Sequence, residues 1–175
     1  PNFYKISKIY IMRCLIVLFV LVTLALLICG IWGYGQFVLP GPLTTEKTIV
    51  IPRGIGIERI SMMLGRHSII RMPLIFSIGA RTIGAGKRLK AGEFSFSNHI
   101  SPRAVMTILQ SGKQVVRRLT VAEGLSNKQI LEVLNKTDGL TGKAKMPSIE
   151  GELLPETYYF SYGDNRNTLI RRMFV

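Results

Sequence analysis

The chain has 175 residues, a formal net charge of +13, 47% hydrophobic residues and 19% charged residues. This apolar content excludes an intrinsically disordered chain, and two cysteines are too few for a disulfide-stapled fold. The charged fraction lies below the ~25% of an average soluble protein, which indicates that apolar residues are concentrated in one region. The length allows one domain or two small ones.

The concentrated apolar region lies near the N-terminus. No Asp, Glu, Lys or Arg occurs between Arg13 and Glu46, and Leu15 through Trp32 is almost entirely aliphatic or aromatic. About 20 such residues cross a ~30 Å hydrocarbon layer, and this run has no polar stripe of the kind that a core helix shows. We therefore predict a transmembrane helix over residues 14–34, preceded by a cytoplasmic tail over residues 1–13.

The charges on either side of this run predict its orientation. Lys5, Lys8 and Arg13 precede the run, so the short tail should stay in the cytoplasm and the bulk of the chain should lie outside it. A cleaved signal peptide is the alternative, but no small-residue cleavage site of the A-x-A type follows the run. Both cysteines, Cys14 and Cys29, fall within the predicted span. The outer part therefore has no thiol for nucleophilic catalysis or for zinc.

A linker rich in glycine and proline is expected over residues 35–47. A strand over 48–51 follows, then helices near 56–65 and 73–80, and a second strand that contains Phe94 and Phe96. Hydrophobic periodicity supports each of these elements. The order βααβ over residues 48–97 predicts one compact unit.

The remainder, residues 98–175, predicts a second domain of mixed helix and strand. Ser101-Pro102 begins a helix that Gly112 ends, residues 115–121 are β-rich, and Ser126 with Gln129 forms a capping box. A loop over 137–148 follows, and an amphipathic helix begins at Leu169. Its apolar stripe needs a partner surface, so we expect this domain to be incomplete in the chain. The fold class is therefore α+β, with an N-terminal transmembrane helix.

Two short segments resemble nucleotide-binding motifs but lack residues that those motifs require. Gly54-Ile55-Gly56 lacks the third glycine of a dinucleotide-binding loop, and Gly86-Lys87 lacks the rest of a phosphate-binding loop. His67 and His99 stand alone, without the neighbours that a metal site needs. We expect neither a metal nor another cofactor.

The basic residues are numerous but scattered. Three of the 23 Lys and Arg precede the apolar run, which leaves 20 of them after it against all 10 Asp and Glu. Nucleic acid could attract such a charge, but the predicted topology places these residues outside the cytoplasm. An anionic membrane surface or cell-wall polymer is the favoured partner, and nucleic acid is not expected.

Residues 149–160 carry the densest chemical signal. Glu150, Glu152 and Glu156 lie beside glycine, proline and a run of aromatic residues. Enzymes that act on carbohydrates use a protonatable carboxyl group at the scissile oxygen, and aromatic rings can pack against sugars. An exposed acidic turn that leads into an edge strand is the simpler interpretation, and the residue pattern alone favours it.

Four segments, taken in chain order, favour the carbohydrate-active site over the exposed acidic turn. They are TIVIPRG at 48–54, LKAGEF at 89–94, LTVAEGL at 119–125 and EGELLPETY at 150–158, the last matching a signature EGxxxPxTY. Together they resemble the YceG-like (MltG) endolytic murein transglycosylases. The resemblance runs over nearly the whole chain beyond the predicted span.

The resemblance implies a membrane-anchored enzyme of the bacterial inner membrane whose bulk faces the periplasm. Residues 48–97 would form a LysM-like subdomain, and residues 98–175 the first part of an α/β catalytic domain. Glu150 would be the catalytic carboxyl group. Tyr158, Tyr159 and Glu156 would be the residues that bind substrate, with Tyr158 also shielding Glu150 from solvent.

The activity that the resemblance implies is cleavage of MurNAc–GlcNAc bonds within nascent glycan strands. The products carry 1,6-anhydroMurNAc ends, and the cuts end glycan elongation. Expected partners are glycan strands, the membrane and, as a further candidate, peptidoglycan synthases. The alternative is a non-catalytic, membrane-anchored scaffold that binds peptidoglycan.

Overall fold

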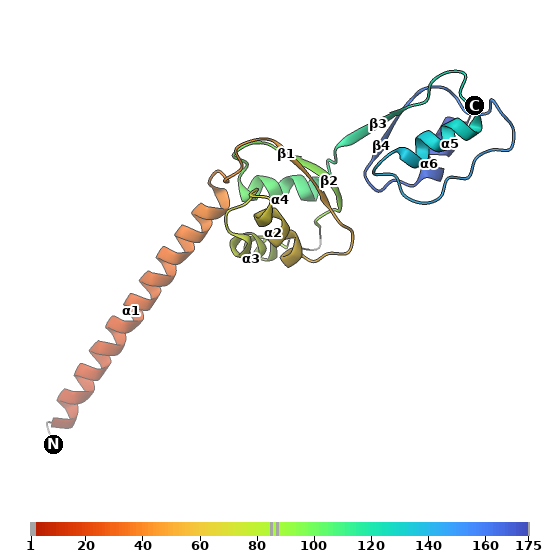
Figure 1. Cartoon of the computed structure of the whole chain (residues 1–175). Helices are drawn as coiled ribbons and strands as arrows, with labels where there is room; N and C mark the ends of the chain where they lie inside the picture. Colours follow the sequence, from red (N-terminus) through yellow and green to blue (C-terminus); the bar gives the residue numbers. More distant parts are fainter. Residues whose placement is uncertain (1–2, 85, 87, 175) are drawn as a thin grey trace.

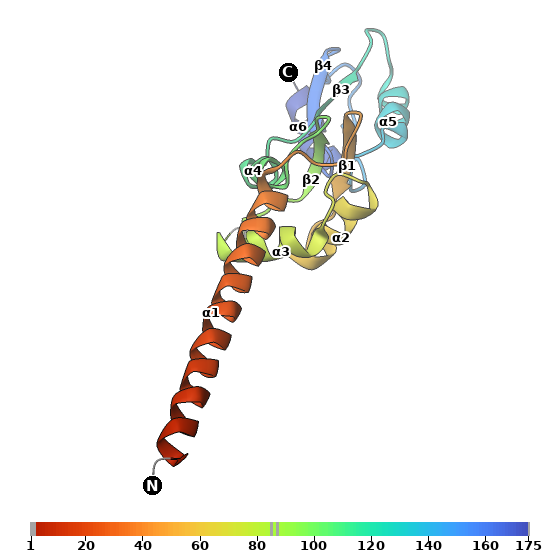
Figure 2. The same ribbon diagram turned by 90° about the vertical axis from the view of Figure 1, so that its left-hand side faces the viewer.

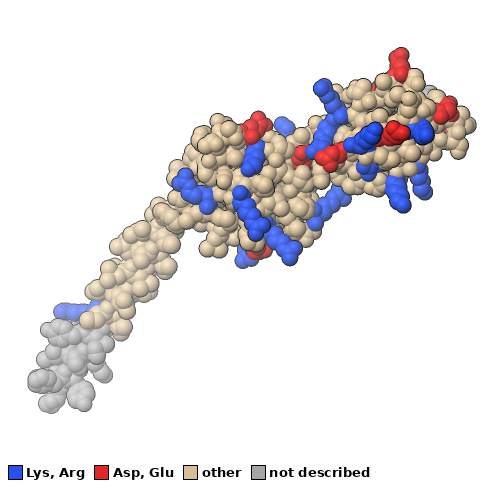
Figure 3. All heavy atoms as spheres, in the orientation of Figure 1, with Lys and Arg blue, Asp and Glu red and all other residues tan. Residues whose placement is uncertain are grey.

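The computed structural model describes residues 3–84, 86 and 88–174, and it consists of one long helix followed by two lobes (Figure 1). Helix α1 (Phe3–Val38) is 36 residues long. Its segment Met12–Val38 is long and apolar enough to cross a membrane. The part of α1 next to the first lobe carries no charged side chain (Figure 3). The mixture of helices and strands confirms the α+β class.

Helix α1 extends further than the span predicted over residues 14–34. It includes residues 35–38, which the sequence assigned to a linker, because no proline interrupts it before Pro40 and Leu39 N still donates to Gly35 O at 2.8 Å. Phe37, near its end, is buried in the core of the first lobe. The helix is therefore packed directly onto this lobe.

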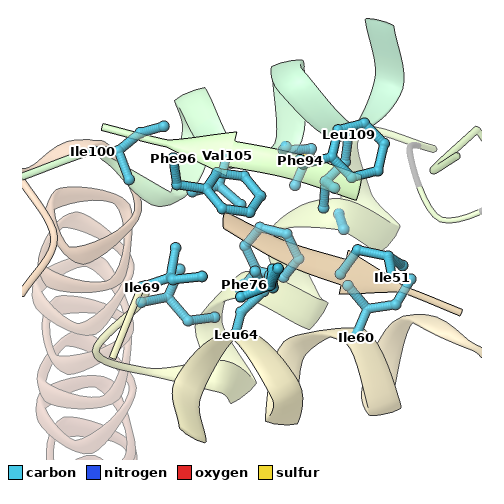
Figure 4. Packing of buried hydrophobic residues seen from close by; sticks show 14 of the residues in the cluster. Ile51, Ile60, Leu64, Ile69, Phe76, Phe94, Phe96, Ile100, Val105 and Leu109 are labelled. Carbon is cyan, nitrogen blue, oxygen red and sulfur yellow. The ribbon is translucent and has the colours of Figure 1, made fainter. Parts of the chain in front are cut away.

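The first lobe contains β1 (Lys47–Ile51), α2 (Ile57–Arg66), α3 (Pro73–Thr82), β2 (Gly92–Phe96) and α4 (Pro102–Ser111). Strands β1 and β2 are antiparallel, with Ile49 opposite Phe94, so the order β1–α2–α3–β2 has the expected βααβ arrangement. Phe76, Phe94 and Phe96 are fully buried between the strands and the helices (Figure 4).

Helix α4 packs into this same core. Its buried residues Val105, Met106 and Leu109 belong to the first cluster, so the lobe continues through α4 rather than ending at residue 97 as the sequence suggested. The ends of α4 are as predicted. The Ser101 hydroxyl accepts from Ala104 N, and Gly112 ends the helix with a left-handed φ of 70°.

The second lobe contains β3 (Val116–Thr120), α5 (Asn127–Lys136), β4 (Thr157–Ser161) and α6 (Arg166–Met173). Strands β3 and β4 are antiparallel, with Leu119 opposite Tyr158. The predicted capping box is present at the start of α5, where Ser126 and Gln129 bond to each other's backbone N–H groups. A separate core holds this lobe together and includes Leu134, Phe160, Leu169 and Ile170.

The two lobes meet at the short link between α4 and β3. Val115 N donates to Glu93 O at 2.8 Å. The residue just before β3 is therefore hydrogen-bonded to β2. The Arg117 guanidinium binds the Glu93 carboxylate through two hydrogen bonds, Nε to Oε2 at 2.6 Å and Nη2 to Oε1 at 2.9 Å. Arg117 Nη1 also contacts Asp138 Oδ2 at 3.2 Å. These carboxylates, Glu93 first, raise the pKa of Arg117, which stays charged.

Candidate functional site around Glu150

Glu150 lies on an exposed turn that precedes β4. The turn passes through Gly151, whose φ of 84° is one that L residues rarely adopt. The carboxylate does not extend freely into solvent, because Glu150 Oε2 accepts a hydrogen bond of 2.7 Å from the backbone N–H of Asn127. Asn127 is the first residue of α5, so the carboxylate lies at the positive end of that helix.

Asn127 also holds the backbone that carries Glu150. Its side-chain amide donates to the carbonyl oxygens of Pro147 at 3.0 Å and Ile149 at 2.9 Å. The residue is 9% exposed, and its own Oδ1 is buried without a hydrogen-bond partner among the described residues. One residue therefore fixes both the turn and one oxygen of the carboxylate on it.

The opposite oxygen, Glu150 Oε1, has no protein donor in the described part of the chain. A carboxyl group with one oxygen fixed by an N–H and the other unbonded is arranged to exchange a proton through the unbonded oxygen. The arrangement leaves one carboxylate oxygen available for proton transfer.

Tyr158 points into the second lobe. It is 6% exposed, and its hydroxyl donates to Leu154 O at 2.8 Å. Burial, followed by the charge of Glu156, raises the pKa of Tyr158, while Arg172 opposes the shift. So little of the ring is exposed that it can present only a small surface to a sugar.

Tyr159 and Glu156 lie at the surface. Tyr159 is 60% exposed and stands opposite Arg118 across the β3–β4 pair, on the face that points away from the core. Glu156 is exposed at the entrance to β4, where its carbonyl accepts from Val121 N at 3.0 Å. Among the described residues, no hydrogen bond joins Glu150 to Tyr158, Tyr159 or Glu156.

The sequence analysis did not identify Asn127. The available signal was its position, because asparagine has a low helix propensity and competes for backbone hydrogen bonds, yet here it occupies the first turn of a well-capped helix. A polar side chain at such a position commonly bonds to a neighbouring segment, and this one bonds to the turn of Glu150.

Other features of the described residues do not add to this site. They contain no group of three or more His, Cys, Asp or Glu that could hold a metal ion. A hollow in the first lobe is lined by residues of α1 and α3, and Glu150 is not among its lining residues.

The architecture is an apolar helix bearing two α+β lobes, with one glutamate held at a helix N-terminus in the second. The sequence model of the YceG-like family matches residues 49–175, and the chain belongs to this family. Comparison with curated proteins gives no match.

Among solved structures, the chain is similar to a YceG-like protein from Listeria monocytogenes. The two are 24% identical with a TM-score of 0.46, and the match covers 74% of this chain and 53% of that protein. The chain thus spans about half the length of the Listeria protein.

Proposed function

We propose that the chain is the membrane-proximal part of an endolytic murein transglycosylase. Family membership over residues 49–175 supports this proposal. The observation that carries it is the position of Glu150: the glutamate of the EGxxxPxTY segment has one oxygen held by Asn127 N and the other without a protein donor in the described residues.

The proposed reaction uses this single carboxyl group twice. Glu150 Oε1–H first donates its proton to the glycosidic oxygen between MurNAc and GlcNAc, and the bond from MurNAc C1 to that oxygen breaks. The resulting carboxylate then accepts the proton of the MurNAc C6 hydroxyl while O6 attacks C1. The products are a 1,6-anhydroMurNAc end and a free GlcNAc hydroxyl. No water is consumed, and Glu150 returns to its protonated form.

The surrounding chain would contribute orientation and substrate contact. Asn127 would keep Oε1 directed at the substrate by holding Oε2 and the turn. Exposed Tyr159 could pack against a sugar ring, and Glu156 could accept from sugar hydroxyls. Tyr158 would act indirectly, by fixing the backbone between Leu154 and β4.

The proposed location is the bacterial inner membrane. Helix α1 would cross it once, with the two lobes on the periplasmic side among nascent glycan strands and near the synthases that make them. Cuts made there would limit strand length. The first lobe, residues 48–97 with α4, would act as the LysM-like glycan-holding unit.

Glu150→Gln in the full-length protein tests the assignment. The amide keeps the shape and the acceptor for Asn127 N but cannot transfer the proton, so release of anhydro-muropeptides should fall by about 10²–10⁴-fold. Glu152→Gln makes the same chemical change two residues away and should leave release near the wild-type level. Muropeptide analysis by mass spectrometry measures both.

Two outcomes would count against the proposal. Release that persists in Glu150→Gln would remove Glu150 from the chemistry. Glycan binding without release in the wild-type protein would favour a non-catalytic scaffold.

A further inference from the structure

A hollow of about 670 Å³ lies between helix α1 and helix α3. This volume is in the ~300–1,000 Å³ range of sites that hold small ligands. Its walls are almost wholly apolar: Leu26, Gly30, Gly33 and Phe37 come from α1, and Ile75 and Ile78 come from α3. We refer to it as the α1–α3 groove.

Two glycines on α1, Gly30 and Gly33, line the open part of the α1–α3 groove. Residues 26, 30, 33 and 37 recur at helical spacing and so share one face of α1. At the lobe end of this face, buried Phe37 lies so close to Gly79 of α3 that a Cβ on Gly79 would come within 2.7 Å of the ring. Further along α1, a Cβ on Gly30 or Gly33 would meet nothing within 4 Å. The groove is closed by Phe37 and open beside the glycines.

The α1–α3 groove lies at the depth of the hydrocarbon layer if α1 crosses a membrane. Counting about 20 residues from Leu15 places the outer edge of that layer near Tyr34. Leu26, Gly30 and Gly33 then lie inside it, and the groove wall from α3, which stands beside the upper turns of α1, lies opposite them (Figure 2).

Helix α3 presents an apolar surface at this level. Leu74 is 70% exposed, Ile78 is 51% exposed, and Ile83 just beyond the helix is 59% exposed. Large apolar side chains grouped on one exposed helix are typical of a surface that contacts another molecule or a membrane. If α1 crosses a bilayer, the lipids around α1 also contact this surface of α3. The bilayer is therefore the partner that we consider for it.

A basic side chain stands at the edge of the α1–α3 groove. Arg103, at the start of α4, lines the groove, and its guanidinium makes no ion pair or hydrogen bond within the described part of the chain. An arginine binds a phosphate through two parallel hydrogen bonds. The excess of basic residues after the apolar run also attracts an anionic leaflet.

We propose that the α1–α3 groove binds one acyl chain of an anionic phospholipid from the bilayer that α1 crosses, with the lipid phosphate at Arg103. The lipid would fill the space left by Gly30 and Gly33 and would fix the first lobe against the membrane surface. The inference rests on the membrane span proposed above and is independent of the chemistry at Glu150.

The test uses the complete chain in nanodiscs of phosphatidylcholine and phosphatidylglycerol. A trace of phosphatidylglycerol with a photoreactive diazirine in its acyl chain is crosslinked, and the adducts are mapped by mass spectrometry. Adducts should form on α3, over residues 75–83, as well as on α1. Adducts confined to α1 would show ordinary lipid contact with a span and would overturn the proposal.

A matched pair of variants tests the groove itself. Gly30→Leu places a side chain in the lining of the groove and occupies part of it, whereas Gly35→Leu makes the same change on α1 outside the lining. Both substitutions favour the helix, so neither should prevent folding. Gly30→Leu should lower the α3 adducts about tenfold, the loss expected when two or so methylene groups are displaced from apolar contact. Gly35→Leu should not change them. Equal adducts in the two variants would overturn the proposal.

Further arms separate the remaining possibilities. Arg103→Gln should reduce the preference for the phosphatidylglycerol probe over a phosphatidylcholine probe, and Arg59→Gln on α2 is the control. Adducts between two protein chains at α3 would identify a second copy as the occupant and overturn lipid binding. A wild-type chain that does not float with vesicles would refute both the membrane span and lipid binding in the groove. The proposed catalytic role of Glu150 would be tested separately by Glu150→Gln.

Discussion

Arg117 joins the two lobes through a single guanidinium. It binds Glu93 of β2 with two hydrogen bonds, contacts Asp138 after α5, and lies 5.5 Å from the centre of the Tyr162 ring. Glu93 is 7% exposed, so its carboxylate has little access to water without Arg117. Removing one partner of such an ion pair leaves an uncompensated charge, which destabilises a protein more than replacing both partners by apolar residues.

Arg117→Ala should therefore lower the free energy of unfolding by about 1–3 kcal/mol. Denaturant unfolding of the complete chain in detergent measures it. Arg118→Ala, the adjacent exposed arginine, should change the free energy of unfolding by less than about 0.5 kcal/mol. Glu93→Ala combined with Arg117→Ala should recover part of the loss, because no unpaired charge remains. Similar effects for Arg117→Ala and Arg118→Ala would mean that the link between the lobes adds little stability.

Tyr158 makes the stability of the second lobe depend on pH in the alkaline range. Burial raises the pKa of its hydroxyl above the ordinary value of about 10, so ionisation is harder in the folded chain than in the unfolded chain. Below pH 10 the phenol is neutral in both states and its contribution is constant. Above pH 10 the unfolded state loses the proton first, so stability falls until the pH passes the raised pKa.

Tyr158→Phe should remove this alkaline contribution. At about pH 8 the variant should be less stable by about 1 kcal/mol, because Leu154 O loses its donor. Above about pH 10 its stability should fall less steeply than that of the wild type. Tyr159→Phe removes the same hydroxyl from an exposed position and serves as the control in denaturant unfolding at each pH. Parallel curves for the wild type and Tyr158→Phe would contradict the assignment.

At the scale of elements, local signals predicted most of the fold. Ser101 with Pro102, Gly112, and the pair Ser126 and Gln129 act through hydrogen bonds within three or four residues, and each helix end lies where they indicate. Strands β1 and β2 follow from alternation of apolar residues. Such signals depend only on neighbours in sequence, so they can be recognised without a structure.

Relations between elements could not be predicted in the same way. The apolar stripe of α4 shows that the helix is half-buried but not which core receives it, and it packs into the first lobe. The hydrogen bond of Glu150 with Asn127 joins residues 23 apart, and that of Arg117 with Glu93 joins residues 24 apart. The motif alone predicted the candidate glutamate, whereas the residue that holds it depends on tertiary packing.

At the scale of the whole molecule, α1 and the first lobe form a continuous body. Phe37 packs against Gly79, and Leu43 and Gly41 are buried just beyond the end of the helix. Gly41 is required here, since a Cβ would come within 2.8 Å of Ile69 O. The glycine and proline residues after α1 thus make a close turn onto the lobe, and the orientation of α1 in a membrane also determines the position of Glu150.

The orientation can be tested with single cysteines. Lys5, Lys8 and Arg13 precede the apolar segment, and the first charges after it are Glu46 and Lys47, so the N-terminal tail should remain in the cytoplasm. In a chain whose Cys14 and Cys29 are replaced by serine, Ser97→Cys places a thiol on an exposed residue of the first lobe. A membrane-impermeant maleimide added to intact bacterial spheroplasts should label it.

Ser7→Cys in the same background is the matched control, because it places the thiol on the other side of the apolar segment. It should be labelled only after the membrane is permeabilised. Replacing Lys5, Lys8 and Arg13 by glutamine should make labelling of Ser7→Cys appear in intact spheroplasts, because the positive charges that resist translocation are gone. If Ser97→Cys reacted only after permeabilisation, both lobes would face the cytoplasm, where Glu150 could not reach a periplasmic glycan.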